Sequence, residues 1–373
     1  MGDRSYSLYL WHWPVFLLGD AFGLTRDIAG IVSLVAISIL LSHFSYRLIE
    51  RPFWKGRFSS AAPFRTVVAS VAVVALAVGV AHGLKVSVFG EPQVIAQQVD
   101  YNPRRDLPAI YDPDLGCDSY YHSAELVPCF EGDVNAKYNA VLLGDSIGAQ
   151  WVSLLTEAYS SPDWRVAVLT KSACPIVNEE YFYAPIGDYY EVCAAWRESA
   201  IAYLAETAPD IVFIGSSSHY EFTAEQWIDG ATGVLEQLTA AATQVVVIPG
   251  TPALSFNGPS CLESPYRYSF RLLDSRRECE ERLASTTSAE VALYLGQAAA
   301  PFENAHVVNF NDLVCPGGRC AAQSSDGLTV FRDKRHLTVT FVKAQVTEAL
   351  SRLRRIRVGP NFPKQAAVLA SSD

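Results

Sequence analysis

The chain has 373 residues, is 50% hydrophobic and carries a formal net charge of −10 at pH 7. This length allows one large soluble domain and an additional segment. The acidic balance argues against a nucleic-acid partner, because binding to phosphates requires a basic surface. The hydrophobic content is high for a soluble protein, and the excess is not spread evenly along the chain.

Uncharged runs near the N-terminus predict contact with a lipid bilayer. Residues 28–46 and 66–84 contain no Asp, Glu, Lys or Arg, and each is close to the ~20 residues that span a hydrocarbon core. Residues 5–19 are also uncharged but contain Pro14, and we interpret 6–22 as a membrane helix or half-helix. A buried core helix is the alternative for each long run. The sequence thus predicts two to three transmembrane helices.

The positive charges between the two long runs predict their orientation. Residues 47–65 contain five Lys or Arg residues and a single acid, Glu50. Short loops rich in Lys and Arg stay in the cytoplasm, so this loop is predicted to lie inside. The run 66–84 then leaves the cytoplasm, and everything after Lys85 is predicted to lie outside it.

All eight cysteines follow the last uncharged run, which indicates an oxidising outer compartment. We predict that they pair sequentially as 117–129, 174–193, 261–279 and 315–320, one of the many connectivities that eight cysteines allow. Free buried thiols are the alternative. A zinc site is disfavoured, because Cys315-x4-Cys320 has no second Cys or His pair at the spacing of a zinc finger.

The remaining chain divides into a linker, a domain and a tail. Residues 86–137 are rich in Pro, Asp and Tyr, and we interpret them as an extracytoplasmic linker. Strands are predicted at 140–143, 166–169, 211–214, 244–248 and 306–309, and helices at 147–160, 189–207, 223–242, 264–299 and 338–354. This alternation over residues 138–358 predicts a three-layer α/β domain, with a parallel sheet covered by helices on both faces. Residues 359–373 are predicted to be a disordered tail.

Two distant segments of this domain predict a serine nucleophile with its base. Ser146 directly follows the first predicted strand, and parallel sheets bind ligands at the carboxyl ends of their strands. A serine hydroxyl is a poor nucleophile unless a base, oriented by a third group, lies within hydrogen-bond reach. His336 and Asp333 supply that base and its orienting carboxylate. A turn after the strand and an exposed loop histidine are the alternatives.

These motifs resemble those of two known families. Gly144-Asp145-Ser146, with Asp333-x-x-His336 near the carboxyl end, resembles the SGNH (GDSL-like) hydrolase family over roughly residues 138–355. Residues 5–15 (SYSLYLWHWPV) and 45–53 (SYRLIERPF) look like the closing membrane helices of acyltransferase-3 proteins, so residues 1–85 resemble the C-terminal remnant of that module. The two modules occur fused in bacterial O-acetyltransferases that modify lipopolysaccharide O-antigen or peptidoglycan.

The resemblance implies a division of labour in a bacterial inner membrane. The membrane module would pass an acetyl group from cytoplasmic acetyl-CoA across the bilayer. The periplasmic SGNH-like domain would place it on a sugar hydroxyl of a cell-surface polysaccharide through an acetyl-Ser146 intermediate, with no bound cofactor or metal. The chain starts near that family's last membrane helices, as a fragment or a natural truncation would, so we expect transport to need the missing acyltransferase-3 portion as a partner.

The oxyanion hole departs from the pattern of the SGNH family. That family usually supplies a glycine after the second strand and an asparagine after the third. Here the two stretches are residues 170–175 (TKSACP) and 215–219 (GSSSH). Four residues are therefore predicted to provide the stabilising groups: Ser146, Ser172, Ala173 and Ser217.

Two other functions remain open at this point. A membrane-anchored carbohydrate O-acetylesterase would use the same three residues with water as the acceptor. A non-catalytic glycan-binding module would keep the fold alone. His219, beside Tyr220, is predicted to line the sugar site in each case; a loop histidine without a role is the alternative.

Overall fold

The computed structural model describes residues 5–21, 24–25, 28–54, 68, 71–72, 74–76, 78–79, 101–160, 162–263, 279–282 and 287–360. The described residues fall into two compact units, one within residues 1–93 and a larger one within residues 94–373. Most of the predicted run 66–84, residues 86–100 of the predicted linker and residues 361–373 of the predicted tail lie outside this description.

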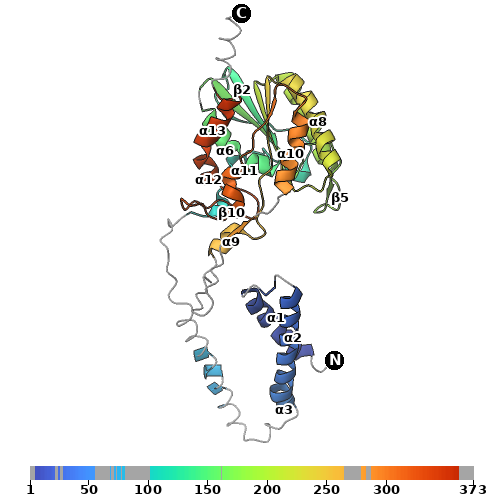
Figure 1. Cartoon of the computed structure of the whole chain (residues 1–373), viewed down its shortest axis with the longest axis vertical. Helices are drawn as coiled ribbons and strands as arrows, with labels where there is room; N and C mark the ends of the chain where they lie inside the picture. The colour runs from blue at the N-terminus through green and yellow to red at the C-terminus, as the bar shows by residue number, and fades with distance from the viewer. Residues whose placement is uncertain are drawn as a thin grey trace, which may run out of the picture. The chain divides into compact units, whose positions relative to one another are not determined.

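The N-terminal unit contains two helices that pack together, α1 (Ser5–Ala21) and α2 (Ile28–Ser45) (Figure 1). The segment α2 continues through a π-helical turn, η2 (Tyr46–Glu50), into α3 (Arg51–Trp54). Within the described ranges, one helix is long and apolar enough to cross a membrane: Ile28–Glu50, with 23 residues and a mean hydropathy of 2.1. Most of its large apolar side chains are exposed, as in a helix that presents them to lipid.

A six-stranded sheet forms the centre of the larger unit, in the order β1-β3-β2-β6-β7-β9. The strands are β1 (Cys129–Gly132), β2 (Tyr138–Gly144), β3 (Trp164–Thr170), β6 (Ile211–Gly215), β7 (Gln244–Ile248) and β9 (Ala305–Val307). All neighbouring strands run parallel except β1, which pairs antiparallel with β3 at the edge. The predicted parallel sheet is confirmed, and β1 is an addition that comes from the segment interpreted as a linker.

Helices cover both faces of this sheet (Figure 1). One face carries α5 (Ser146–Ala149), α6 (Val152–Ala158), α12 (Val339–Ala344) and α13 (Val346–Arg355), and the other carries α7 (Glu191–Thr207), α8 (Ala224–Ala241) and α10 (Thr287–Ala299). Alternate strand residues enter different cores: Leu142 belongs to the first and Leu143 to the second. This alternation follows from the two-residue period of a strand and confirms the predicted three-layer α/β architecture.

Smaller elements surround the sheet. They are β4 (Phe182–Tyr183), β5 (Asp188–Tyr189), α9 (Gly258–Glu263), β8 (Glu280–Arg282), α11 (Asn311–Val314), β10 (Arg319–Ala321) and the 3-10 turns η3 (Pro103–Arg105), η4 (Ala109–Tyr111), η5 (Tyr120–His122) and η6 (Pro316–Gly318). The predicted helix 264–299 is wrong at 280–282, because β8 pairs there with β10. Residues 264–278 of that prediction lie outside the described part.

The predicted sequential pairing of the cysteines is confirmed. The four disulfides are Cys117–Cys129, Cys174–Cys193, Cys261–Cys279 and Cys315–Cys320. The first ties the segment before the sheet to β1, and the second ties the loop after β3 to α7. Both therefore restrain segments that reach the carboxyl ends of the parallel strands.

Candidate active site

Ser146 is the first residue of α5 and directly follows β2. The turn between them brings backbones close together, because a Cβ atom at Gly148 would lie 2.1 Å from the carbonyl oxygen of Gly215. Only glycine allows this approach of α5 to the end of β6. The packing of α5 against β6 thus fixes the backbone position of Ser146.

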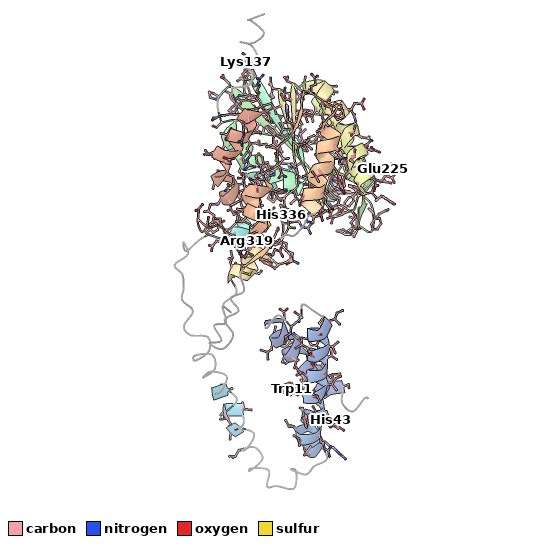
Figure 2. All side chains as sticks on the ribbon, in the orientation of Figure 1. Trp11, His43, Lys137, Glu225, Arg319 and His336 are labelled. Atoms are coloured by element: carbon pink, nitrogen blue, oxygen red, sulfur yellow. A yellow bond between two sulfur atoms is a disulfide. The ribbon has the colours of Figure 1, made fainter. Side chains whose placement is uncertain are left out.

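The structure brings the three residues of the predicted triad together. His336 Nε2 lies 2.9 Å from Ser146 Oγ, and His336 Nδ1 lies 2.7 Å from Asp333 Oδ2. In Figure 2, His336 lies at the end of the domain opposite Lys137, which directly precedes β2. The three side chains therefore meet at the carboxyl ends of the parallel strands, where open α/β sheets bind ligands.

The environment of Asp333 favours its charged form. Its Oδ1 accepts hydrogen bonds from the backbone N–H groups of Arg335 (2.7 Å) and His336 (2.8 Å). Partial burial works to raise the pKa of Asp333, but the His336 side chain and the two N–H donors outweigh it, so the pKa lies well below its usual value. An ionised Asp333 accepts the Nδ1 proton of His336 and leaves Nε2 to accept a proton from Ser146.

Asp145, which precedes the serine, is fully buried and joins two loops. Its side-chain oxygens accept hydrogen bonds from the N–H groups of Ile147 (2.7 Å), Gly148 (3.1 Å) and Ser217 (2.7 Å), and from the hydroxyls of Ser216 (3.2 Å) and Tyr220 (2.6 Å). Burial raises the pKa of Asp145, and these hydrogen bonds oppose the increase. Asp145 thus caps α5 and also holds the loop after β6 against it.

The four predicted oxyanion residues are in different hydrogen-bonding states. The N–H of Ser172 donates to both carboxylate oxygens of Asp118, at 3.1 and 3.0 Å, and its hydroxyl donates to Asp118 Oδ2 at 2.6 Å. The N–H of Ser217 donates to Asp145, while its Oγ accepts from the N–H of His219 at 3.2 Å. The N–H and the hydroxyl of Ser172 are therefore already used in hydrogen bonds to Asp118. The hydroxyl of Ser217, in contrast, is still available to donate a hydrogen bond.

Ser146 and Ala173 both line the cleft. Within the described chain, neither backbone N–H has a hydrogen-bond acceptor. Ala173 has a φ of +58°, in the left-handed region that favours glycine. This residue therefore adopts the backbone conformation that a glycine would adopt without strain.

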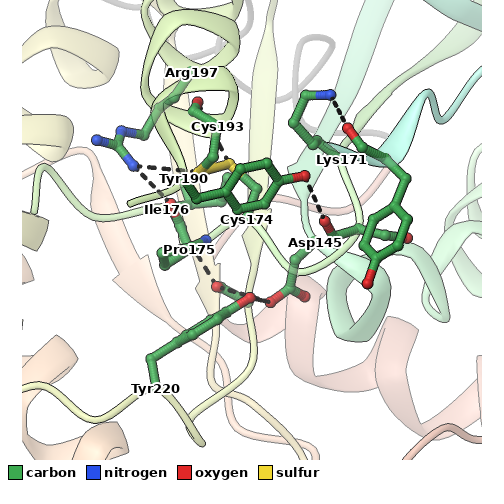
Figure 3. Close-up of a disulfide and its surroundings, with 12 residues drawn as sticks. Asp145, Lys171, Cys174, Pro175, Ile176, Tyr190, Cys193, Arg197 and Tyr220 are labelled. Atoms are coloured by element: carbon green, nitrogen blue, oxygen red, sulfur yellow. Dashed lines mark hydrogen bonds between the residues drawn. A yellow bond between two sulfur atoms is a disulfide. The ribbon is translucent and has the colours of Figure 1, made fainter. Parts of the chain in front are cut away.

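The loop that contains Ala173 is held from three directions (Figure 3). The Cys174–Cys193 disulfide joins it to α7. The Tyr190 hydroxyl donates to the Ser172 carbonyl oxygen at 3.3 Å, and the guanidinium of Arg197 donates to the Pro175 carbonyl oxygen at 3.0 Å. These contacts fix the peptide groups on either side of Ala173.

Sequence reasoning missed Lys171 and Asp118, which attach residues 117–123 to the end of β3. Lys171 is buried, and its Nζ donates to Ser119 Oγ (3.0 Å) and to the carbonyl oxygens of Tyr120 (2.6 Å) and Ser123 (2.7 Å). Burial lowers the pKa of Lys171 to about 8, although the charge of Asp118 opposes the change. The available signal for Lys171 was a lysine placed directly after the buried end of β3.

These elements enclose a cleft of about 600 Å³ beside Ser146 and His336. Five tyrosines contribute to its walls: Tyr111, Tyr120, Tyr181, Tyr183 and Tyr220. The predicted His219 also lines the cleft, and its pKa is lowered by burial and by the charge of Arg335. The Tyr220 hydroxyl is engaged by Asp145, so this residue offers its ring rather than a free polar group.

The cleft offers acyl-transfer chemistry. It combines a serine hydroxyl, a hydrogen-bonded imidazole and backbone N–H groups at the start of a helix, which are the parts that nucleophilic attack on an acyl carbonyl requires. Across the described ranges, no group of three or more His, Cys, Asp or Glu residues is arranged to hold a metal ion.

Comparisons with known proteins give local or distant similarities. O-acetyltransferase OatA from Staphylococcus aureus (strain NCTC 8325 / PS 47) is 38% identical over 62 residues, which are 16% of this chain and 10% of the OatA sequence. The match therefore spans a small part of that relative.

Two solved structures are similar at low sequence identity. The periplasmic domain of a lipopolysaccharide acetyltransferase from Salmonella ser. Paratyphi A has a TM-score of 0.46 and 15% identity, covering 59% of this chain and 84% of its own. Axe2, an acetylxylan esterase from Geobacillus stearothermophilus, has a TM-score of 0.33 and 14% identity, covering 60% and 95%.

The family comparison covers more of the chain. The matching family model is described as the SGNH domain that is fused to AT3 domains, and it matches residues 116–348. The matched range contains Ser146, Asp333 and His336, together with Asp118 and Lys171. This match extends over more than half of the sequence, and the chain accordingly belongs to the family of SGNH domains fused to AT3 domains.

Proposed function

We propose that this chain is an O-acetyltransferase that acetylates a bacterial cell-surface polysaccharide, of O-antigen or peptidoglycan type, through an acetyl-Ser146 intermediate. The observation that carries the proposal is the hydrogen-bonded line from Ser146 through His336 to Asp333, inside a cleft walled by tyrosines. Membership of the SGNH family and the local similarity to an O-acetyltransferase support the same reaction class.

In the first half of the reaction, Ser146 attacks the carbonyl carbon of an acetyl donor. His336 Nε2 accepts the hydroxyl proton, and the ionised Asp333 stabilises the imidazolium that forms. The developing oxyanion receives hydrogen bonds from the N–H groups of Ser146 and Ala173 and from the Ser217 hydroxyl. His336 then returns the proton to the leaving group, which leaves acetyl-Ser146.

In the second half, a sugar hydroxyl attacks the acetyl-serine ester. His336 removes the proton of that hydroxyl and returns it to Ser146 Oγ as the ester breaks. Tyrosine rings suit a sugar acceptor, because they combine a flat apolar face with a polar edge. Water in place of the sugar would give acetate, so the occupancy of the cleft by acceptor decides between transfer and hydrolysis.

The proposed location is the outer face of the bacterial plasma membrane, with the SGNH domain in the periplasm. The apolar helix Ile28–Glu50 supports a membrane anchor, and the four disulfides support an oxidising compartment. Acetyl-CoA would be the ultimate donor, through an acyltransferase-3 membrane portion whose closing helices residues 1–85 resemble.

A chromogenic acetyl ester tests this proposal with the full chain in detergent. We expect added oligosaccharide to become O-acetylated at the expense of free acetate. Ser146→Ala should abolish both products. Acetate as the sole product at every acceptor concentration would identify an O-acetylesterase instead, and oligosaccharide binding without any acetyl product would identify a glycan-binding module.

A further inference from the structure

The loop that carries the base and its carboxylate partner also carries two arginines that line the cleft, Arg332 and Arg335. Within the part of the chain that the structure describes, neither guanidinium forms an ion pair. Other arginines do pair with carboxylates: Arg104, Arg319 and Arg352. A guanidinium stays charged at physiological pH, so both side chains bring positive charge to the cleft without a direct carboxylate partner.

The Arg332 side chain lies against Tyr111, which forms one wall of the cleft (the Tyr111 wall). Its guanidinium carbon is 5.8 Å from the centre of the Tyr111 ring. Arg332 Nε and the Tyr111 hydroxyl are both buried and have no hydrogen-bond partner among the described residues. Buried polar groups nearly always have partners, so two unpartnered polar atoms on residues that line one cleft indicate a place where a ligand supplies the acceptors.

The acidic residue that lines this cleft forms no ion pair with Arg332. Asp118 lines the same cleft, but its oxygens accept hydrogen bonds from the N–H and hydroxyl of Ser172 and from the N–H of Tyr120. The chain as a whole is acidic, with a net charge of −10, so the two arginines in the cleft are a local feature of an otherwise acidic chain.

The chemistry of these donors indicates an anion rather than a neutral sugar. A guanidinium presents its N–H groups as a planar fork that matches two oxygens of a carboxylate or phosphate. Burial, together with the negative charge of Asp118, raises the pKa of the Tyr111 hydroxyl, so this group keeps its proton and acts as a donor. The two N–H groups of the Arg332 fork and the Tyr111 hydroxyl together suit an anion whose oxygens offer three lone pairs as hydrogen-bond acceptors.

We propose that Arg332 and Tyr111 form a subsite for an anionic substituent, a carboxylate or a phosphate, on the polysaccharide acceptor. This inference rests on the function proposed above and specifies its substrate class as an acidic glycan. The anion would bind on the Tyr111 wall, while a hydroxyl of the same or an adjacent sugar reaches Ser146. The subsite thus selects an acidic acceptor and determines which of its hydroxyl groups lies next to Ser146.

Binding to the Ser146→Ala variant of the full chain tests the subsite apart from the chemistry. The probes are an oligogalacturonate, an uncharged oligogalactose of the same length and its phosphate monoester, titrated in detergent by calorimetry. We expect at least one acidic probe to bind about tenfold or more tightly than the neutral probe, because charge-assisted hydrogen bonds to a guanidinium are strong. The tighter of the two acidic probes identifies the anion.

Three further variants in the same background assign the effect. Arg332→Gln should reduce the acidic preference to about twofold or less, and Arg332→Lys should retain part of it, because the charge stays and the fork is lost. Arg354→Gln is the matched control, since Arg354 is an exposed residue of α13 outside the cleft, and it should preserve the preference.

Equal binding of acidic and neutral probes would overturn the subsite, and so would an acidic preference that survives both changes at Arg332. A fold defect in Arg332→Gln would appear as weaker binding of the neutral probe as well, and Arg332→Lys then decides. Because no acetyl transfer is measured, a failure of the proposed acetyltransferase activity leaves these results interpretable, and the two hypotheses fail separately.

Discussion

The Tyr220 hydroxyl donates a 2.6 Å hydrogen bond to Asp145, the residue that directly precedes Ser146. Tyr220 comes from the loop after β6, and Asp145 from the turn after β2. One buried carboxylate thus sets the position of Ser146 and of the Ser217 loop together, so the nucleophile and a candidate oxyanion donor share a single support.

Tyr220→Phe tests that support. The change keeps the aromatic ring in the cleft and removes one donor to a buried carboxylate, so we expect the free energy of unfolding to fall by about 1–3 kcal/mol. Chemical denaturation measures this loss. Tyr189→Phe is the control, because Tyr189 is half exposed and should change stability by less than about 0.5 kcal/mol. Equal effects of the two changes would refute the role of the hydrogen bond.

The lowered pKa of Asp333 predicts a pH-dependent contribution to stability. Because the folded state holds this carboxyl ionised below its ordinary pKa, the contribution is complete above the ordinary value of about 3.9 and is lost as the pH falls toward the folded value. Wild type should therefore exceed Asp333→Asn in stability at pH 6, and the difference should shrink as the pH drops below about 4. A difference that stays constant down to pH 2 would contradict this assignment.

Lys171→Met is predicted to disturb acceptor binding more than ester cleavage. The change removes three hydrogen bonds that attach residues 117–123 to the end of β3. We expect the KM for an oligosaccharide acceptor to rise about tenfold, with a smaller change in hydrolysis of a small acetyl ester. The exposed Lys343 of α12 offers the control Lys343→Met, which should leave both parameters unchanged. Parallel losses in both assays would mean that the nucleophile itself had moved.

Ala173 provides a test of backbone conformation in the candidate oxyanion hole. At a φ of +58°, a non-glycine residue is strained by about 1 kcal/mol, and a β-branched residue by more. We expect Ala173→Gly to retain ester cleavage and Ala173→Val to lose most of it, with kcat rather than KM affected. Steady-state kinetics with a small acetyl ester distinguish these effects. Full activity of Ala173→Val would remove this N–H from the proposed mechanism.

The sheet could be predicted because its parallel strands are buried and strongly patterned, whereas elements at its edge could not. The edge strand β1 has four residues that are half-buried or exposed, so it lacks the apolar run that identifies a central strand. The strand Glu280–Arg282 is charged, and it exists because it pairs with residues 319–321. A local pattern cannot reveal a partner that lies so far along the chain.

The candidate site likewise contains some residues that could be predicted from the sequence and others that could not. The position of Ser146 follows from topology, since it directly follows a parallel strand. His336 lies on a loop before α12 that directly follows no strand of the parallel sheet, and its role is predicted from the spacing of Asp333 and His336. Asp118 contacts Ser172 across 54 positions of sequence, from a segment with little periodicity, and nothing in its neighbourhood marks it as part of a cleft. The engaged N–H of Ser172 was unpredictable for the same reason.

Identification of the acetylated residue tests the central claim most directly. The full chain in detergent would be reacted with an acetyl ester without acceptor, quenched in acid and analysed by peptide mass spectrometry. The account predicts one additional acetyl group on the peptide that contains Ser146, absent in Ser146→Ala and discharged when oligosaccharide is added. Acetyl transfer to the oligosaccharide without any acetyl group on Ser146, or with the group on another residue, would contradict it.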